Sequence, residues 1–215
     1  MGRAQVNNRE GRGVEQDYAE AAKWYRSAAQ QGNAEAQYRL GLMYNEGQGV
    51  TQDYAEAVKW YRLAAEQGDA YAQYNLGVMY DEGRGVTQDY AEAAKWYRLA
   101  AEQGNAEAQF FLGLAYVDGL GVVRDYQAAI YWLQQCAEQG DRVAQMYLGQ
   151  IHRKGECGAP DYRQALKWYR LSAEQGFAEA QLSLGSMYYD GQGVAQDYAE
   201  AAKWCRLAAE QGHQG

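Results

Sequence analysis

Residues 33–68 read NAEAQYRLGLMYNEGQGVTQDYAEAVKWYRLAAEQG, and residues 69–104 repeat that pattern as DAYAQYNLGVMYDEGRGVTQDYAEAAKWYRLAAEQG. The pattern returns every 36 residues along most of the 215-residue chain. A fixed period of roughly 20–50 residues is typical of stacked repeat architectures, in which each unit contacts only its neighbours. The sequence therefore predicts a repeat protein, and its tryptophans mark the period at Trp24, Trp60, Trp96, Trp132, Trp168 and Trp204.

Each repeat predicts two helices joined by a glycine turn. Asn33 is a good N-cap for a first helix over residues 34–46, which we call helix A. The sequence Gly47-Gln48-Gly49 then breaks the helix, because two glycines so close together favour a turn. A second helix over residues 54–67, helix B, follows, and a left-handed glycine cap is expected at Gly68.

An acidic pair is predicted to cap helix B. Asp53 stands at the N-cap position and Glu56 follows three residues later, which is the spacing of a capping box. Because the pair recurs at the same place, capping is favoured over acid–base catalysis. The other pairs are Asp17/Glu20, Asp89/Glu92 and Asp197/Glu200.

Repeated side chains define one core-facing arc on each helix. Helix A keeps the positions of Ala36, Gln37, Leu40, Gly41 and Tyr44, which cover roughly 140° of its circumference. Gly41 is unfavourable inside a helix, so it is expected to let helix B approach until the two backbones nearly touch. Helix B keeps the positions of Tyr54, Ala57, Trp60, Tyr61, Ala64 and Ala65.

The pattern A-x-A-Q-x-x-L-G-x-x-Y, then G-x-G-V, then D-Y-x-x-A-x-x-W-Y-x-x-A-A-x-x-G resembles the Sel-one-like repeat (SLR) family. These repeats are related to the tetratricopeptide repeats, and the match covers residues 10–212. The resemblance implies an all-α fold, a right-handed superhelical α/α solenoid whose A helices line a concave surface. It also implies an adaptor in protein complexes, as in many bacterial members. A cysteine-rich branch is linked to β-lactam binding or hydrolysis, but this chain lacks its regular cysteine pairs.

The repeat boundaries give the predicted domain organisation. Residues 1–32 are expected to form a degenerate partial repeat with helix B only, and residues 213–215 form a tail. The array has no polar capping helix, so we expect either that the chain is a fragment of a longer array or that its ends associate with another copy. The five full repeats between them are 33–68, 69–104, 105–140, 141–176 and 177–212.

Composition narrows the class of partner and leaves the compartment open. A formal net charge of −8 argues against nucleic acid, which needs a basic face. No apolar stretch is long enough to insert into a membrane. The N-terminal MGRAQVNNRE is not a signal peptide. A periplasmic or secreted bacterial protein is expected if the chain has been trimmed, and a cytoplasmic one otherwise.

The sequence predicts no catalytic residue, no metal site and no cofactor. Cys136, Cys157 and Cys205 occupy unrelated repeat positions, so unpaired thiols are favoured over a Cys136–Cys157 bridge. His152 replaces a core tyrosine and is expected to be packed and hydrogen-bonded. A nucleophilic Cys157–His152 pair lacks an orienting third group.

Function is sought on the arc of helix A that differs between repeats. An exposed row of apolar side chains suits a peptide groove, whereas the alternative is that this row packs against the next repeat. The groove reading predicts a non-catalytic scaffold that binds a protein or peptide on the concave helix A surface. A β-lactam-binding enzyme and an end-to-end assembly element are the alternatives. The predicted partner-binding residues are Tyr38, Leu42, Tyr74, Val78, Phe110, Leu114, Met146, Gln150, Arg153, Lys154, Leu182 and Tyr189.

Residues 110–160 depart most from the repeated pattern. Lys154 stands where every other full repeat has Glu or Asp, and with Arg142 and Arg153 it predicts a local basic patch in an acidic protein. We expect this segment to determine specificity and to receive an acidic or carboxylate-bearing peptide, although neutral drift predicts the same scatter.

Overall fold

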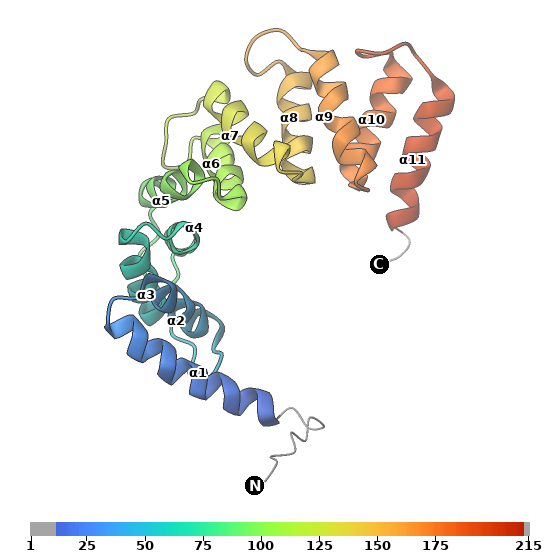
Figure 1. Ribbon diagram of the computed structural model, residues 1–215. Coiled ribbons are helices and arrows are strands. Elements are labelled where there is room, and N and C mark those ends of the chain that lie inside the picture. Colours follow the sequence, from blue (N-terminus) through green and yellow to red (C-terminus); the bar gives the residue numbers. More distant parts are fainter. Residues whose placement is uncertain (1–11, 213–215) are drawn as a thin grey trace. The chain divides into compact units, whose positions relative to one another are not determined.

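The computed structural model describes residues 12–212, and all regular secondary structure within them is α-helical (Figure 1). The chain divides into two compact units, Met1–Asn105 (unit 1) and Ala106–Gly215 (unit 2). Within each unit, consecutive helices pack against one another. The predicted all-α solenoid is confirmed.

Unit 1 alternates B and A helices. Its A helices are α2 and α4, and the other three are B helices. Their bounds are α1 (Arg12–Gln30), α2 (Ala34–Glu46), α3 (Tyr54–Glu66), α4 (Ala70–Glu82) and α5 (Tyr90–Glu102).

Unit 2 begins with an A helix and follows the same alternation. Its A helices are α6, α8 and α10. The bounds are α6 (Ala106–Asp118), α7 (Tyr126–Glu138), α8 (Arg142–Lys154), α9 (Tyr162–Glu174), α10 (Ala178–Asp190) and α11 (Tyr198–Gly212).

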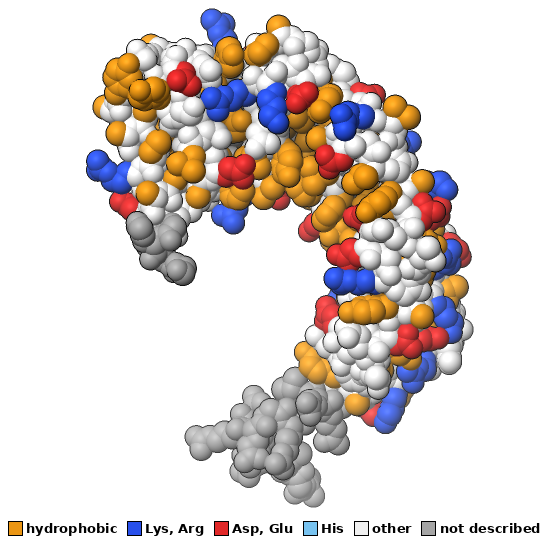
Figure 2. Space-filling model, turned by 180° about the vertical axis from the view of Figure 1, so that it is seen from behind, with side chains coloured by type: hydrophobic (Ala, Val, Ile, Leu, Met, Phe, Trp, Pro, Cys, Tyr) orange, Lys and Arg blue, Asp and Glu red, His pale blue; other side chains and the backbone are white. Residues whose placement is uncertain are grey.

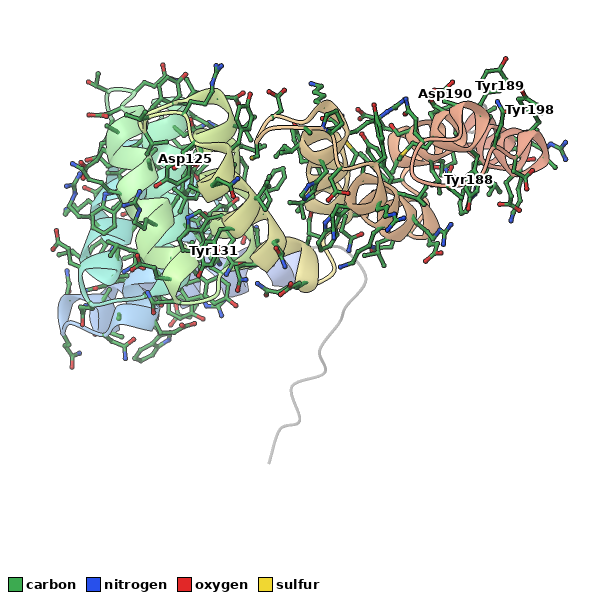
Figure 3. All side chains as sticks on the ribbon, turned by 90° about the horizontal axis from the view of Figure 1, so that it is seen from above. Asp125, Tyr131, Tyr188, Tyr189, Asp190 and Tyr198 are labelled. Atoms are coloured by element: carbon green, nitrogen blue, oxygen red, sulfur yellow. The ribbon has the colours of Figure 1, made fainter. Side chains whose placement is uncertain are left out.

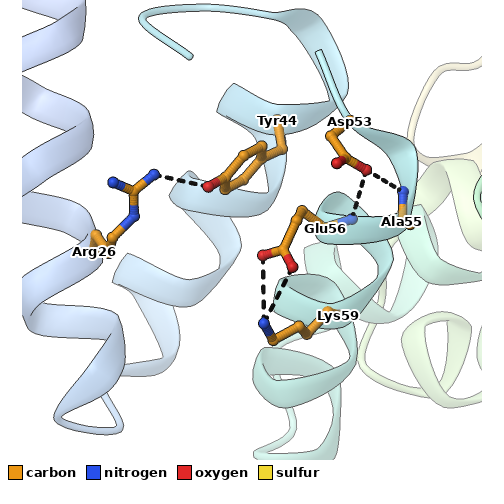
Figure 4. Close-up of polar contacts among 6 residues, drawn as sticks. All are labelled: Arg26, Tyr44, Asp53, Ala55, Glu56 and Lys59. Carbon is orange, nitrogen blue, oxygen red and sulfur yellow. Dashed lines mark hydrogen bonds and ion pairs between the residues drawn. The ribbon is translucent and has the colours of Figure 1, made fainter. Parts of the chain in front are cut away.

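Only half of the expected capping box forms at the start of helix B. The Asp53 carboxylate accepts hydrogen bonds from the backbone N–H groups of Ala55 and Glu56 (Figure 4). The Glu56 carboxylate does not return to Asp53 but accepts from Lys59 Nζ at 3.2 Å. The return bond is not needed, because the backbone N–H of Asp53 already donates to the carbonyl of Tyr44.

Glycines take two different structural roles. Gly47 and Gly68 adopt φ values of 72° and 93°, the left-handed caps that the sequence predicts. A Cβ at Gly41 would lie 2.6 Å from the ring of Tyr61, so this glycine makes room for an aromatic ring. The close approach expected at Gly41 thus makes room for a side chain of helix B, and at the equivalent Gly77 a backbone carbonyl of helix B, that of Ala93, also lies 3.3 Å from the added Cβ.

Buried glutamines connect each repeat to the preceding one. The side-chain amide of Gln37 donates to the backbone carbonyl of Ala29 in the preceding helix B, and its oxygen accepts from Gln67 at the end of its own repeat. Both bonds recur in the same form around Gln73, Gln145 and Gln181. Burial makes such a bond hard to lose, because an unpaired buried amide is unfavourable.

An arginine–tyrosine hydrogen bond is a second connection between repeats, and it is missing from the junction of α7 and α8. Arg26 donates to the Tyr44 hydroxyl at 2.7 Å (Figure 4), and Arg62–Tyr80 and Arg170–Tyr188 repeat the contact. At α7–α8 the two positions carry Gln134 and His152. Gln134 donates instead to Glu138 in its own helix.

Candidate functional site

One register of the A helices forms the predicted row of apolar side chains: Tyr38, Tyr74, Phe110, Met146 and Leu182. In unit 1 this row lies between neighbouring helices and is half-buried. The ring of Tyr38 lies 6.0 Å from that of Tyr71 on the next A helix and 6.2 Å from that of Tyr61 on helix B. Tyr74 contacts Tyr97 in the same way, at 6.1 Å. Tyr71 remains 61% exposed, so Tyr38 and Tyr71 together present an aromatic surface on the A helices.

In unit 2 the same row runs from buried to exposed. Phe110 is half-buried against Tyr147, with ring centroids 5.9 Å apart. Met146 is only 4% exposed and belongs to a core cluster with residues of α9 and α10. Leu182 is 52% exposed. The row therefore combines packing between neighbours with exposed surface, and Met146 contributes packing alone.

The other predicted positions lie along the same A helices. Leu42, Val78 and Leu114 are half-buried. Gln150 is also half-buried, and its amide donates to Glu179 on α10 at 3.1 Å. Tyr189 is 60% exposed and makes an edge contact with Tyr198 at 5.3 Å, and both project from the α10–α11 end of unit 2 (Figure 3).

A pocket of about 420 Å³ opens between α8, α9 and α10. Two of its side chains, Arg153 and Lys154, are basic, and none is acidic. Its wall brings together predicted residues from α8 and residues that the sequence analysis did not select. The lining is Gln150, Arg153, Lys154, Tyr162, Tyr169, Ser183 and Gln192.

Arg153 is fixed in the wall of this pocket. Its Nε donates to Gln192 at 3.1 Å and its Nη2 donates to Ser186 at 2.9 Å. Asp190 lies 3.8 Å away in a long, partly exposed ion pair. The buried Tyr169 lies beneath it; burial raises the pKa of its hydroxyl, while the Arg153 charge and hydrogen bonds to Ser183 and Arg153 counteract that rise.

Lys154 is exposed and lies in the last turn of α8, where the helix dipole favours a cation. None of the residues that the structure describes forms an ion pair or hydrogen bond with its ammonium group. Arg142, in contrast, lies eleven residues before Arg153, roughly 16 Å along the helix, with its guanidinium over Phe177. The predicted patch of three basic residues is therefore wrong: it contains Arg153 and Lys154 only.

A second pocket, of about 280 Å³, lies on the other side of α8. It shares Gln150 and Lys154 with the first pocket. Its charges are balanced, and apolar and aromatic side chains make up the rest. The lining is Val117, Asp118, Arg124, Tyr126, Tyr147, Gln150, Ile151, Lys154 and Glu156.

The altered loop of the fourth repeat borders this second pocket. Elsewhere the second loop glycine packs against a backbone carbonyl of the preceding helix B, as Gly85 does on Tyr54. Cys157 occupies that position and its Cβ cannot fit there, so residues 155–158 form a separate turn in which the Gly158 N–H donates to Gly155. Gly158 also replaces the valine that packs into the core at Val86.

Among the described residues, no thiol forms a hydrogen bond with the His152 ring. All three cysteines are free, with Cys136 buried and the other two exposed. Burial raises the pKa of Cys136 to about 12, and burial together with Asp125 and Glu156 raises that of Cys157, which disfavours the thiolate. Burial lowers the pKa of His152, and no described residue accepts or donates a hydrogen bond to its ring. No group of metal-binding side chains occurs between residues 12 and 212.

Charge on the outside of the molecule is mixed. Figure 2 shows hydrophobic patches separated by acidic and basic side chains, with no broad basic face on the side in view. The two cations of the pocket between α8, α9 and α10 are therefore a local departure from the net charge of −8. No described helix is long and apolar enough to cross a membrane.

The missed site residues belong to two groups. Tyr169 recurs as a core residue, so repetition concealed its role in the pocket floor. Gln192 and Ser183 occupy variable positions, and only the packing of α10 beside α8 brings them to Arg153. Variability was the sequence signal that could have identified them.

Comparison with known proteins identifies the repeats. A family model described as Sel1 repeat matches residues 4–33, 34–69, 70–105, 106–141, 142–177 and 178–213. The chain is 46% identical to a protective antigen of uropathogenic Escherichia coli that displays an SLR fold, with a TM-score of 0.89; the match covers 94% of this chain and 43% of that one. It is 35% identical to a Sel1 repeat protein from Oxalobacter formigenes, with a TM-score of 0.82 and coverage of 91% and 83%. No curated protein matches the chain.

Proposed function

This chain belongs to the Sel1 repeat family, and we propose that it is a non-catalytic scaffold that binds a protein or peptide along its A helices. Sel1 repeat proteins generally mediate protein–protein interactions. The finer proposal concerns where this chain binds its partner. The A helices differ between repeats at solvent-facing positions, while their opposite faces are fixed by the core.

One observation carries the proposal: large apolar side chains stay exposed on the A helices of both units. Tyr71 in unit 1 and Leu182 in unit 2 are each more than half exposed. Aromatic anchors such as tyrosine are enriched among the residues that supply most of the binding energy at protein interfaces, and exposed aliphatic side chains add apolar area to such a surface. Because Met146 is buried, the proposed surface excludes it and is built from the half-buried and exposed members of the row.

Site-specific photo-crosslinking tests the location of the binding surface. A photoreactive phenylalanine analogue is placed at Tyr71 or Leu182 on the A helices and, as controls, at Lys59 or Lys203 on the exposed faces of B helices. After irradiation in the native cell, we expect adducts of defined mass from the A-helix positions only. Adducts from the B-helix positions alone would place the partner on the opposite side and contradict the proposal.

A further inference from the structure

We propose that an extended peptide segment crosses the C-terminal end of α8, with an acidic side chain in the pocket between α8 and α10 and an apolar side chain in the pocket between α6 and α8. The inference rests on the proposed function and specifies the chemistry of its ligand.

The pocket between α8 and α10 is suited to a carboxylate. Its lining contains two cations, the hydroxyls of Tyr162, Tyr169 and Ser183, and no acidic side chain. Hydrogen bonds from Arg153 to Gln192 and Ser186 hold the guanidinium in place before any ligand arrives. A preorganised cation loses little conformational entropy on binding. The long Asp190 contact is weak competition, because exposed ion pairs contribute little.

Lys154 supplies the charge that no described residue neutralises. Lys154 lines both pockets. A peptide segment that runs from one pocket to the other can therefore place an acidic side chain beside its ammonium group. Gln150, Arg153 and Lys154 are spaced at i, i+3 and i+4, which places them on one face of α8.

The other repeats show that this charge is specific to α8. The equivalent pair is Asn45 and Glu46 on α2, Asp81 and Glu82 on α4, and Tyr189 and Asp190 on α10. The same backbone thus carries neutral or acidic pairs without a change in fold. The fold of the repeat therefore does not require a basic pair at this position, which is consistent with a role in recognising an anion.

The lining of the second pocket predicts which other residue of the ligand binds beside its acidic residue. Its cations are balanced by Asp118 and Glu156, and Val117, Ile151 and Tyr147 supply apolar surface. The two pockets flank α8, and the diameter of a helix with its side chains is roughly 10–12 Å, which about three residues of extended chain span. We therefore expect an acidic residue and an apolar residue two or three positions apart in the ligand.

The test is a selection from random peptides displayed as internal segments, so that no free C-terminal carboxylate is present. Wild-type protein should enrich segments with Asp or Glu near an apolar residue. The binding of individual selected peptides is then measured by fluorescence anisotropy with wild type and R153N/K154E, which carries the pair found on α2. A matched control, K203E/R206N, makes the same charge change on α11, which lines neither pocket.

The inference predicts that R153N/K154E binds the selected peptides at least about tenfold more weakly, and that K203E/R206N stays within about twofold of wild type. Circular dichroism checks folding, and K154Q serves as a second variant because Lys154 has no partner to lose. Selected peptides without acidic enrichment, or equal binding by R153N/K154E, would overturn the inference while leaving a peptide-binding scaffold in place. Failure to select any peptide would count against the proposed function as well.

Discussion

The α4–α5 pair of unit 1 and the α8–α9 pair of unit 2 are built on the same pattern and carry opposite charges. At the end of α4, Asp81 accepts a hydrogen bond from the Tyr97 hydroxyl at 3.2 Å. At the end of α8, Arg153 stands at the equivalent position over Tyr169. The buried tyrosine is common to both, so the repeat fixes the floor of each site and leaves the last turn of helix A free to change sign.

The loops that precede the two B helices differ as much as the charges do. Gly85 adopts a left-handed φ of 69° and packs against a backbone carbonyl, whereas Cys157 lies in a turn that borders a pocket. Loss of one glycine is thus linked to an opening beside the basic pair. A pocket can therefore arise in this scaffold where a glycine needed for loop packing is lost beside positions that change from acidic to basic.

The largest expected effect separates the two loops. Gly85→Ala should destabilise the protein by about 3 kcal/mol, because it adds a left-handed non-glycine residue and a Cβ that overlaps the Tyr54 carbonyl. Cys157→Ala should change stability by less than about 0.5 kcal/mol, since Cys157 is exposed and its backbone is unstrained. Urea denaturation followed by circular dichroism measures both. Equal losses would show that the loops are packed alike.

A second pair of variants tests whether an aromatic ring of helix B limits the space beside a helix A glycine more than a thiol does. A Cβ at Gly77 would lie 2.7 Å from the Tyr97 ring, and one at Gly185 would lie 2.8 Å from Cys205 Sγ. Gly77→Ala should cost about 1–2 kcal/mol after the gain in helix propensity. Gly185→Ala should cost less than Gly77→Ala, because the exposed thiol can rotate away and only the backbone carbonyl of Ala201, 3.2 Å from the added Cβ, stays close. Thermal unfolding compares them, and a larger loss from Gly185→Ala would refute this account.

These differences show what a single sequence can and cannot predict. The helix limits and glycine caps followed from local chemistry, and the predicted helix over residues 34–46 is confirmed as α2. Met146 and Leu182 occupy the same repeat position but differ in exposure, because exposure depends on the neighbour that packs against them. The α8–α10 pocket could not be predicted, since its wall joins Arg153 to Gln192 through tertiary packing. The separation of Arg142 from Arg153 could have been found, because helix rise alone places them at opposite ends.

The missing arginine–tyrosine bond at α7–α8 provides a third test. Q134R/H152Y restores the pair found at α1–α2, α3–α4 and α9–α10, and it should stabilise the protein by about 1 kcal/mol. Burial lowers the pKa of His152 in the folded protein, so below about pH 6.5 the unfolded chain binds a proton more readily than the folded one. Wild-type stability should therefore fall as the pH drops below that value.

In Q134R/H152Y this part of the acid sensitivity should disappear, because the histidine is gone. Urea titrations at pH 5 and pH 8 compare the two proteins, and His152→Phe serves as a control that removes the titrating group without restoring the bond. An acid sensitivity that persists unchanged in both variants would assign the effect to other groups.

The smallest expected effect concerns the buried tyrosines of the B helices, Tyr61 and Tyr97. The Tyr61 hydroxyl is buried without a hydrogen-bond partner among the described residues, so Tyr61→Phe should be neutral or slightly stabilising. Tyr97→Phe should cost about 0.5 kcal/mol, because it removes the bond to the half-exposed Asp81. Calorimetry ranks the stability of the two variants. A greater loss of stability from Tyr61→Phe than from Tyr97→Phe would contradict the assignment of a hydrogen bond to Tyr97 alone.

The paired glutamines have a consequence for how such a chain can change in length. Gln37, Gln73, Gln145 and Gln181 each present a donor to the preceding repeat and an acceptor to their own, so the junctions within each unit use the same two bonds. Duplication or deletion of a whole 36-residue segment would recreate these bonds at the new boundary. Deletion of any other number of residues would leave buried amides without partners. Genetic recombination can thus lengthen or shorten the scaffold in whole repeats. Loss of residues 141–176 would remove the basic pair itself, and loss of a neighbouring repeat would keep the pair but remove one wall of a flanking pocket.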